Sequence, residues 1–582
     1  MAPLSLLSGV FSGSSKRANK HYHRDRGQLS PVSIQKKTMQ PAHVTQSSLA
    51  TLSDDLILYI LDILQDMSPK SILFCMSVCS SFYYHARHVR HRELSIDIGS
   101  NDSIERLGLA SKNNLLPAVR TLKVSGNGQL PSTLGDTLQG MTGLRNVEWS
   151  AASITEPILQ TLQSSPHTTL DIKITDNTKQ LLAELPGSIV LSSVSVNITY
   201  ATAEDCTQVT QPLKQVLLSC PNLRKLSLNL TRPSRGCVAP DPPAQYVGIG
   251  FAAGERPRPL QELRISSYPW GYRSPSPNGG GVNCIGYPEH GLEMDYWTDH
   301  FDWSCLALLE DASVIFAHKV VRKLTALKHV HFTYSQAPVD KQFFELVPSA
   351  LESIHVPTLD SIGINSLAQH ALSLRKLHIH QQQRQMDQWR DRIISNDNLT
   401  SICEILPQLR EVGIDIARDG NDWPYTTLDI LATLPRLQRL DLWFELGNAR
   451  ETVPTPYLAM AQASELFGYL RKRSSTLDCL YLHSGCPPPT SEFGFVTEES
   501  YWPTQNSTSF VCQPAENHDG AAQGLFSVTC PKLSDRLNHK AQCILRGKED
   551  SAGFEEHGID FRVALQGPIP LQEWMDLRNG KT

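Results

Sequence analysis

The chain has 582 residues, 40% of them hydrophobic and 19% charged, which is enough to form several domains or one long repeat array with a buried core. The net charge of -5 gives no general reason to expect nucleic acid or an acidic membrane as a partner, and no apolar run reaches the ~18 residues that a membrane-spanning helix needs. The 13 cysteines are scattered without a CxxC pair, which argues against a disulfide framework, a zinc ribbon and a secreted protein.

Residues 1–47 are rich in Ser, Lys, Arg and His and contain a single acidic residue, Asp25. This composition predicts a disordered basic tail. A mitochondrial presequence has a similar composition, but Pro3, Gly9 and Gly13 would interrupt the amphipathic helix that import requires. We therefore expect a protein of the cytoplasm, the nucleus or both.

Residues 48–92 hold the most regular apolar pattern of the chain, which predicts a module of two short amphipathic helices. In the first helix, apolar side chains recur at helical spacing at Leu52, Leu56, Ile60, Leu61 and Leu64. In the second helix, they recur at Ile72, Leu73, Met76, Cys79 and Phe82. Ser53, followed by Asp54 and Asp55, is the expected N-cap of the first helix. Two helices this apolar can hardly cover their own surface, so the module needs a partner helix or an adjoining domain.

Between residues 93 and 484 a short pattern returns, with apolar residues at its first, fourth and sixth positions. Its clear copies are "VRTLKV" at 119, "LRNVEW" at 144, "LRKLSL" at 223, "LQELRI" at 260, "LKHVHF" at 327, "LESIHV" at 351, "LRKLHI" at 374, "LREVGI" at 409, "LQRLDL" at 437 and "LDCLYL" at 477. Weaker copies begin near 168 and 190. A short strand with a returning helix fits this pattern, so we predict an α/β fold, an irregular leucine-rich-repeat solenoid with parallel strands on the concave face and helices outside. An ordinary α/β domain with parallel strands is the alternative.

Residues 231–304 interrupt the predicted array with a segment dense in Pro, Gly and Ser, which is the composition of a loop. We interpret this insertion as a variable loop on one edge of the array. Alternatively, it is a partner site in which Tyr296, Trp297, Phe301 and Trp303 act as aromatic anchors. The repeat pattern then fades, and residues 485–582 are interpreted as a C-terminal cap and a flexible tail.

The helical module resembles an F-box. The stretch "LSDDLILYILDIL…SILFCMSVCSSFYYHA" is similar to the F-box pattern of an LP dipeptide, an apolar first helix and a second segment of the form "LL…S-V-C-K-x-W/F". The chain departs from this pattern in having Ser53 in place of Pro and a slightly long connecting loop, "QDMSPKS". The resemblance implies docking on the Skp1-type adapter of a cullin-RING ubiquitin ligase. The adapter-binding residues that it implies are Leu52, Ser53, Leu56, Ile57, Ile60, Leu61, Leu64, Val78, Cys79 and Phe82.

An F-box followed by leucine-rich repeats is the arrangement of the F-box/leucine-rich-repeat substrate receptors. By this resemblance the protein would be a non-catalytic subunit that holds a protein substrate near the ubiquitin-charged enzyme, and proximity would supply the catalysis. Two alternatives remain: a helical hairpin that only caps the repeats, and a repeat scaffold without a ubiquitin role. Because no GxSxG, P-loop, HExxH, dinucleotide-binding or kinase motif occurs, we expect no enzyme, no catalytic residues and no cofactor.

The aligned repeats place His331, His355 and His378 at the same outward position of three consecutive strands, with His380 two residues further on. Since neighbouring strands lie about 4.8 Å apart, we expect these imidazoles to form a ladder on the concave face. The following repeats add acidic, aromatic and imidazole side chains in or beside this column at Asp415, Asp441, Trp443, Tyr481 and His483.

Three interpretations of this candidate substrate-binding set are open. A metal site would lack thiol partners, and we expect no metal ion. A surface for acidic or phosphorylated substrates would be strengthened when the histidines become protonated. Ordinary solvated side chains of a concave face are the third interpretation.

Overall fold

The structure, a computed structural model of the chain, describes residues 52–67, 71–165, 167–231, 248–252, 254–268, 293–333, 337–381, 393–445, 456, 458–485, 507–514 and 526–533. The predicted basic tail and the residues after 533 lie outside this part of the chain. Within it, no helix combines the length and the apolar character that crossing a bilayer requires.

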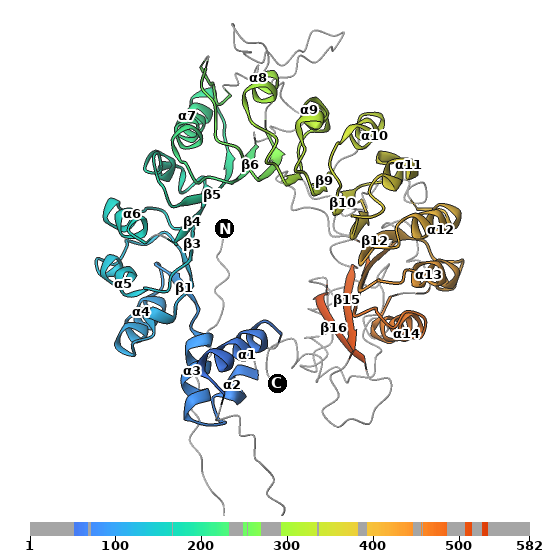
Figure 1. The fold of residues 1–582 in the computed structure, drawn as a ribbon, viewed down its shortest axis with the longest axis horizontal. Helices are drawn as coiled ribbons and strands as arrows, with labels where there is room; N and C mark the ends of the chain where they lie inside the picture. The colour runs from blue at the N-terminus through green and yellow to red at the C-terminus, as the bar shows by residue number, and fades with distance from the viewer. Residues whose placement is uncertain are drawn as a thin grey trace, which may run out of the picture.

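A single curved sheet of sixteen strands follows the chain order from β1 to β16. Neighbouring strands are parallel from β1 to β14, and β15 and β16 are added antiparallel. The strands line the inner side of the curve and the helices form its outer layer (Figure 1). The structure therefore confirms an α/β fold with a long, mostly parallel, open sheet and with helices on its convex side.

The strands are short, as expected for a repeat array. Their bounds are β1 (Glu93–Asp97), β2 (Thr121–Ser125), β3 (Asn146–Trp149), β4 (Thr169–Thr175), β5 (Leu191–Thr199), β6 (Lys225–Thr231), β7 (Glu262–Ser267), β8 (Leu308–Glu310), β9 (His329–His331), β10 (Ser353–Val356), β11 (Lys376–Ile379), β12 (Glu411–Ile416), β13 (Arg439–Phe444), β14 (Cys479–Ser484), β15 (Thr508–Pro514) and β16 (Phe526–Leu533).

The outer helices return the chain from one strand to the next. They are α4 (Asn101–Lys112), α5 (Leu134–Gly140), α6 (Glu156–Gln163), α7 (Ala203–Ser219), α8 (Glu293–His300), α9 (Val314–Val320), α10 (Ala337–Leu346), α11 (Ile364–Ala368), α12 (Asn396–Ile405), α13 (Tyr425–Ala432) and α14 (Met460–Arg471). Between β4 and β5 a 3-10 turn, Lys179–Ala183, takes the place of a helix.

The apolar pattern produces this architecture because its first, fourth and sixth residues all point into the layer between sheet and helices. In the repeat around β11, for example, Leu374, Leu377 and Ile379 are buried. Each repeat packs these residues against its neighbours, and the resulting core runs without a break from Ile96 to Cys512. The core is thus shared among repeats, as in a solenoid.

Two parallel strands lack the complete pattern and were not predicted. In β8, Leu306 and Leu309 are buried at the first and fourth positions, but the sixth position is Asp311, which has a positive φ of 57°. In β1, the first position is the polar residue His91. Both strands nevertheless pair in register with their neighbours.

The interval 231–304 is not one continuous insertion, contrary to the sequence interpretation. It contains β7, which pairs with β6 and β8, and the helix α8. Only residues 232–247, 253 and 269–292 of this interval lie outside the described residues.

The four aromatic residues expected to anchor a partner belong instead to the core. Tyr296, Trp297, Phe301 and Trp303 are all at most 5% exposed. Phe251 stacks on Tyr296, and Phe316 of α9 packs edge-on against Trp297 and Trp303. The prediction of aromatic anchors was wrong because the neighbouring Pro- and Gly-rich composition was extended to a segment that forms a buried helix.

The core positions of the central repeats should dominate stability. Replacing Leu377 or Leu440 by Ala would leave a cavity in the shared core and should lower the free energy of unfolding by about 2–5 kcal/mol, measured by urea denaturation. The exposed Lys376, next to Leu377 in the same strand, is the control, and its Ala variant should change stability by less than about 1 kcal/mol. Equal losses for Lys376→Ala and Leu377→Ala would contradict the assignment of inward and outward positions.

Candidate functional site

The N-terminal module consists of three helices, where the sequence predicted two: α1 (Asp54–Met67), α2 (Ser71–Cys75) and α3 (Ser80–Arg90). The second predicted helix is broken at Ser77–Cys79. The hydroxyl of Ser77 donates to the carbonyl of Phe74, and Cys79 adopts extended backbone angles as the N-cap of α3. Ser53 begins α1 as predicted, since its Oγ accepts a hydrogen bond from the amide of Leu56 at 3.4 Å.

The module has a small core of its own, separate from that of the array. Its buried residues are Ile57, Leu61, Ile72, Phe82, Ala86 and Val89. Of the residues expected in the adapter contact, Ile57, Leu61 and Phe82 therefore hold the three helices together and do not face a partner. Four more are partly buried and pack against this core or beside it, namely Leu52, Ile60, Leu64 and Cys79.

Large apolar side chains gather on the outer surface of this module. Those that are exposed are Leu56, Tyr59, Ile63, Leu73, Phe74, Val78, Tyr83 and Tyr84. All other described residues, which form a far larger surface, add only Leu109, Ile189, Leu346 and Leu372 to this class. We call the eight residues of the module the apolar surface. An exposed patch of this kind is typical of an interaction site.

Of the apolar surface, only Leu56 and Val78 belong to the adapter-binding residues predicted from the sequence, together with the exposed Ser53. Tyr59 and Ile63 were not predicted because the apolar face of α1 is broad, and the spacing alone does not say which part of it turns inward. Phe74, which is 75% exposed, was missed because α2 is only five residues long and gives little periodicity.

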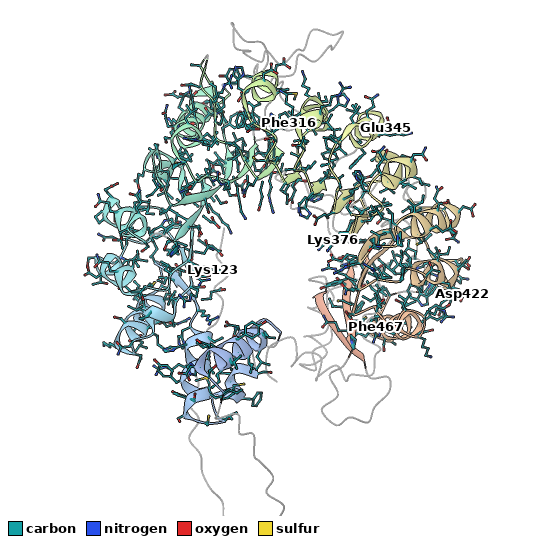
Figure 2. All side chains as sticks on the ribbon, in the orientation of Figure 1. Lys123, Phe316, Glu345, Lys376, Asp422 and Phe467 are labelled. Carbon is teal, nitrogen blue, oxygen red and sulfur yellow. The ribbon has the colours of Figure 1, made fainter. Side chains whose placement is uncertain are left out.

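The second candidate is the histidine ladder on the concave face, whose predicted register is confirmed. His331 pairs with His355, and His355 with His378, in adjacent strands. The rings of His331 and His355 stack at 4.0 Å, and those of His355 and His378 lie 5.5 Å apart. Figure 2 shows Lys376 of β11 toward the inside of the curve and Glu345 of α10 on its outside.

Gly413 continues the column after His378 and has a steric role there. The ring of His378 lies over Gly413, so a Cβ at this position would come within 2.7 Å of its Nδ1 atom. Asp441 and Tyr481 follow in register on β13 and β14.

A parallel row of rings lies beside the ladder. His380 stacks on Trp443 at 3.9 Å, and Trp443 stacks on His483 at 5.0 Å, with each pair of planes within 13°. Asp415 accepts a hydrogen bond from Nδ1 of His380 at 2.6 Å, and Ser509 Oγ lies 2.8 Å from Nδ1 of His483. The predicted residues are therefore brought together, and most of their rings stack on one another.

The two acidic residues of the predicted set are not exposed, contrary to their expected outward position. Asp415 and Asp441 are each 3% exposed. The guanidinium of Arg439 forms two hydrogen bonds with Asp441, at 3.0 and 2.9 Å, and lies 4.1 Å from the ring centre of Tyr481. Asp441 is thus a buried carboxylate paired with a guanidinium that is 40% exposed, and its replacement by Ala would remove these two hydrogen bonds of Arg439.

Two imidazoles of the ladder, those of His355 and His378, favour the neutral form. Burial lowers the pKa of His355 to about 2, assisted by the neighbouring His331, His378 and His380. Burial also lowers the pKa of His378. Burial therefore opposes protonation of His355 and His378, against the expectation that the ladder gains positive charge, because stacking removes these two imidazoles from the water that would stabilise their protonated form.

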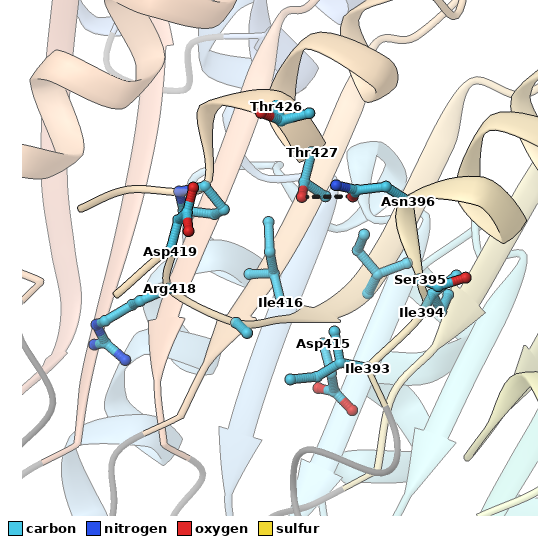
Figure 3. Close-up of a pocket in the computed structure, with 13 residues that line it drawn as sticks. Ile393, Ile394, Ser395, Asn396, Asp415, Ile416, Arg418, Asp419, Thr426 and Thr427 are labelled. Atoms are coloured by element: carbon cyan, nitrogen blue, oxygen red, sulfur yellow. Dashed lines mark hydrogen bonds between the residues drawn. The ribbon is translucent and has the colours of Figure 1, made fainter. Parts of the chain in front are cut away.

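Metal binding finds no support in the geometry of the part of the chain that the structure describes, where no cluster of His, Cys, Asp and Glu is arranged as a set of metal ligands. A pocket of about 300 Å³ does lie at the end of β12, between the first turns of α12 and α13 (Figure 3). Several polar groups that line it are engaged within the protein: Asp415 with His380, Asn396 with Thr427, and Arg418 with two backbone carbonyls. We assign no ligand to it.

Comparison with known proteins gave no relative: no family model matches the chain, and no curated protein matches it. The functional inference accordingly depends on the residues of this chain and their arrangement.

Acid should destabilise the array, because His355 and His370 must gain a proton on unfolding. Their pKa values are about 2 and about 4 in the folded protein, against 6.5 when unperturbed. Between these values the unfolded chain binds more protons, so stability is complete above pH 6.5 and falls as the pH drops below it. Each group contributes up to about 1.4 kcal/mol per pH unit.

Urea unfolding at neutral pH and at about pH 5 measures this effect. The variant His355→Gln should show a weaker fall in stability on acidification, whereas replacement of the exposed His167 by Gln should leave the fall unchanged. An unchanged pH dependence in His355→Gln would contradict a lowered pKa of His355.

Proposed function

We propose that the protein is a non-catalytic F-box/leucine-rich-repeat substrate receptor. In this proposal the N-terminal module docks on a Skp1-type adapter of a cullin-RING ubiquitin ligase, and the curved array presents a protein substrate for ubiquitination. The observation that carries the proposal is the apolar surface, which lies on a small helical module at one end of a long repeat array. The proposed partners are the adapter, the ligase and a protein substrate.

The separation of the module's apolar residues into a buried core and an exposed surface supports docking. Its buried residues already complete a core, so the eight exposed apolar side chains are not needed to hold the helices together. Exposing them to water is unfavourable by about 25 cal/mol per Å² of apolar area. A partner that covers them would recover this free energy, and the helices α1 to α3 can meet it without rearrangement.

The concave face of the array is better suited to binding a protein substrate than to catalysis. Its inner face carries stacked rings and a pair of opposite charges on neighbouring strands, a surface that can recognise the shape of a bound protein. Proximity, which raises the effective concentration of substrate near the ubiquitin-charged enzyme, is then the only catalytic contribution required of the chain.

Adapter binding should depend on the apolar surface and not on exposed apolar residues in general. The double variant Tyr59→Asp with Phe74→Asp should fold normally, because both residues are more than half exposed, and should lose co-purification with a Skp1-type adapter. Placing unpaired carboxylates in a dry contact costs several kcal/mol. The measurement is recovery of purified adapter on the immobilised full chain.

The matched control is Leu109→Asp with Leu372→Asp, two exposed apolar residues of the array, which should bind the adapter like the unmodified chain. Normal adapter recovery with the Tyr59 and Phe74 variant would refute the F-box assignment and leave a repeat scaffold without a ubiquitin role.

Substrate capture should depend on the concave face. Replacing His331, His355 and His378 together by Gln would remove the rings of the ladder while keeping side chains that form hydrogen bonds. We expect the adapter to bind unchanged and the set of substrates recovered with the receptor, quantified by mass spectrometry, to fall at least severalfold. Ala variants of Lys341 and Glu345, exposed on the outer helix α10, serve as controls. Equal recovery from ladder and control variants would move the substrate site away from the concave face.

A further inference from the structure

Three arginines occupy equivalent positions at the start of the array. Arg92, Arg120 and Arg145 each stand immediately before or at the start of β1, β2 and β3. The amide of Arg120 donates to the carbonyl of Arg92 at 2.7 Å, and the amide of Arg145 to that of Arg120 at 2.8 Å. Their Cα atoms are therefore neighbours across the sheet, at a spacing of about 4.8 Å.

The same position further along the array shows that this clustering of charge is not a requirement of the repeat. Before β9, β10 and β11 the residues are Lys328, Glu352 and Arg375, joined by the same backbone hydrogen bonds. There the carboxylate of Glu352 pairs with Lys328 at 2.9 Å and lies between the two cations. At the start of the array the row itself contains no acidic residue, although the carboxylate of Asp62 on α1 pairs with Arg92 and also acts on Arg120.

The helix α3 extends this row toward the apolar surface. It ends two residues before Arg92 and lies beside the first strands (Figure 1). Its last turns carry Arg87 and Arg90, one helical turn apart and close to the apolar-surface residue Tyr84. We call Arg87, Arg90, Arg92, Arg120 and Arg145 the basic band.

Most of this charge has no ionic partner. Among ion pairs between described residues, Arg92 pairs with Asp62 of α1, and the other four arginines of the basic band have none. The like charges are close enough to interact, since Arg145 and Arg92 add to burial in lowering the pKa of Arg120. The position of the Arg120 side chain depends on Gly143. The Nη1 of Arg120 donates to the carbonyl of Gly143, and a Cβ on Gly143 would collide with the guanidinium.

Cations at the end of α3 are favourable to its helix dipole, which accounts for Arg87 and Arg90 in part. It does not account for Arg120 and Arg145, which lie on no helix. Charges of one sign in a row repel each other, and a partner of opposite charge would relieve this repulsion.

We infer that the basic band binds an acidic polypeptide segment of the same partner that docks on the apolar surface. The inference adds a second contact to the proposed function, and it depends on that function for the identity of the docked partner. Continuity with the apolar surface favours a protein as the source of the negative charge. The net charge of the whole chain, -5, opposes the binding of a long polyanion such as nucleic acid.

The test uses the full chain and a fluorescein-labelled oligo-glutamate peptide, with binding measured by fluorescence anisotropy at low and at physiological salt. The variant Arg90→Gln with Arg145→Gln removes the two most exposed arginines of the band. We expect it to weaken peptide binding about fivefold at low salt, since each exposed pair contributes up to about 1 kcal/mol. The matched control, Arg375→Gln with Arg410→Gln, changes the same repeat position in β11 and β12 and should bind like the unmodified chain.

A second arm measures the affinity of the Skp1-type adapter for the same proteins. The band variant should bind it more weakly than the control variant, and this difference should shrink as salt rises. Equal weakening of peptide binding in both variants, or none in either, would overturn the inference, as would tighter binding of oligo-thymidylate than of oligo-glutamate. If the adapter binds equally strongly to all variants, the inference about the basic band is wrong but the proposed function stands. If the adapter does not bind the unmodified chain, the proposed function itself is wrong. Unchanged thermal unfolding curves verify that both variants fold.

Discussion

The constraint on which the structure depends is that no single repeat can bury its own apolar residues. Each unit supplies one short strand and a return segment, and its leucines are covered only when neighbouring units stack on both sides. The continuous core from Ile96 to Cys512 follows from this, and so does the curvature that leaves the sheet on the inside. The two antiparallel strands β15 and β16 end the parallel register, so the last parallel strand, β14, keeps a neighbour on its far side.

A strand of this fold can be predicted from the sequence where its core residues follow the local repeat pattern. The leucine pattern predicted twelve of the strands and their register, because the inward positions are fixed by the alternation of a strand. It failed at β8, where Asp311 occupies an inward position of the pattern, and at Trp297, whose burial comes from contacts with Tyr268 and Phe316, distant in sequence. Such burial is a tertiary property that local composition does not carry.

The candidate sites divide in the same way. Register follows from sequence, so the alignment of His331, His355 and His378 could be predicted. Charge depends on solvation, and the stacking that keeps His355 neutral is visible only in three dimensions. Likewise, the apolar spacing of α1 predicts a helix, but its broad apolar face does not reveal that Ile57 turns inward while Tyr59 faces water.

The two cores give the molecule two regions with different chemistry. Because the module completes its core independently of the array, a partner can cover the apolar surface without disturbing the repeats. The ion pair between Asp62 of α1 and Arg92 connects the regions, and the remaining arginines of the basic band lie along this junction. On the inner face of β9 to β14, by contrast, Asp441 is paired with Arg439, and burial favours the neutral form of His355 and His378. Binding at the junction should therefore respond to salt, whereas recognition by this part of the concave face should depend more on the fit of a substrate to its stacked rings. This separation would let one partner stay bound while substrates exchange.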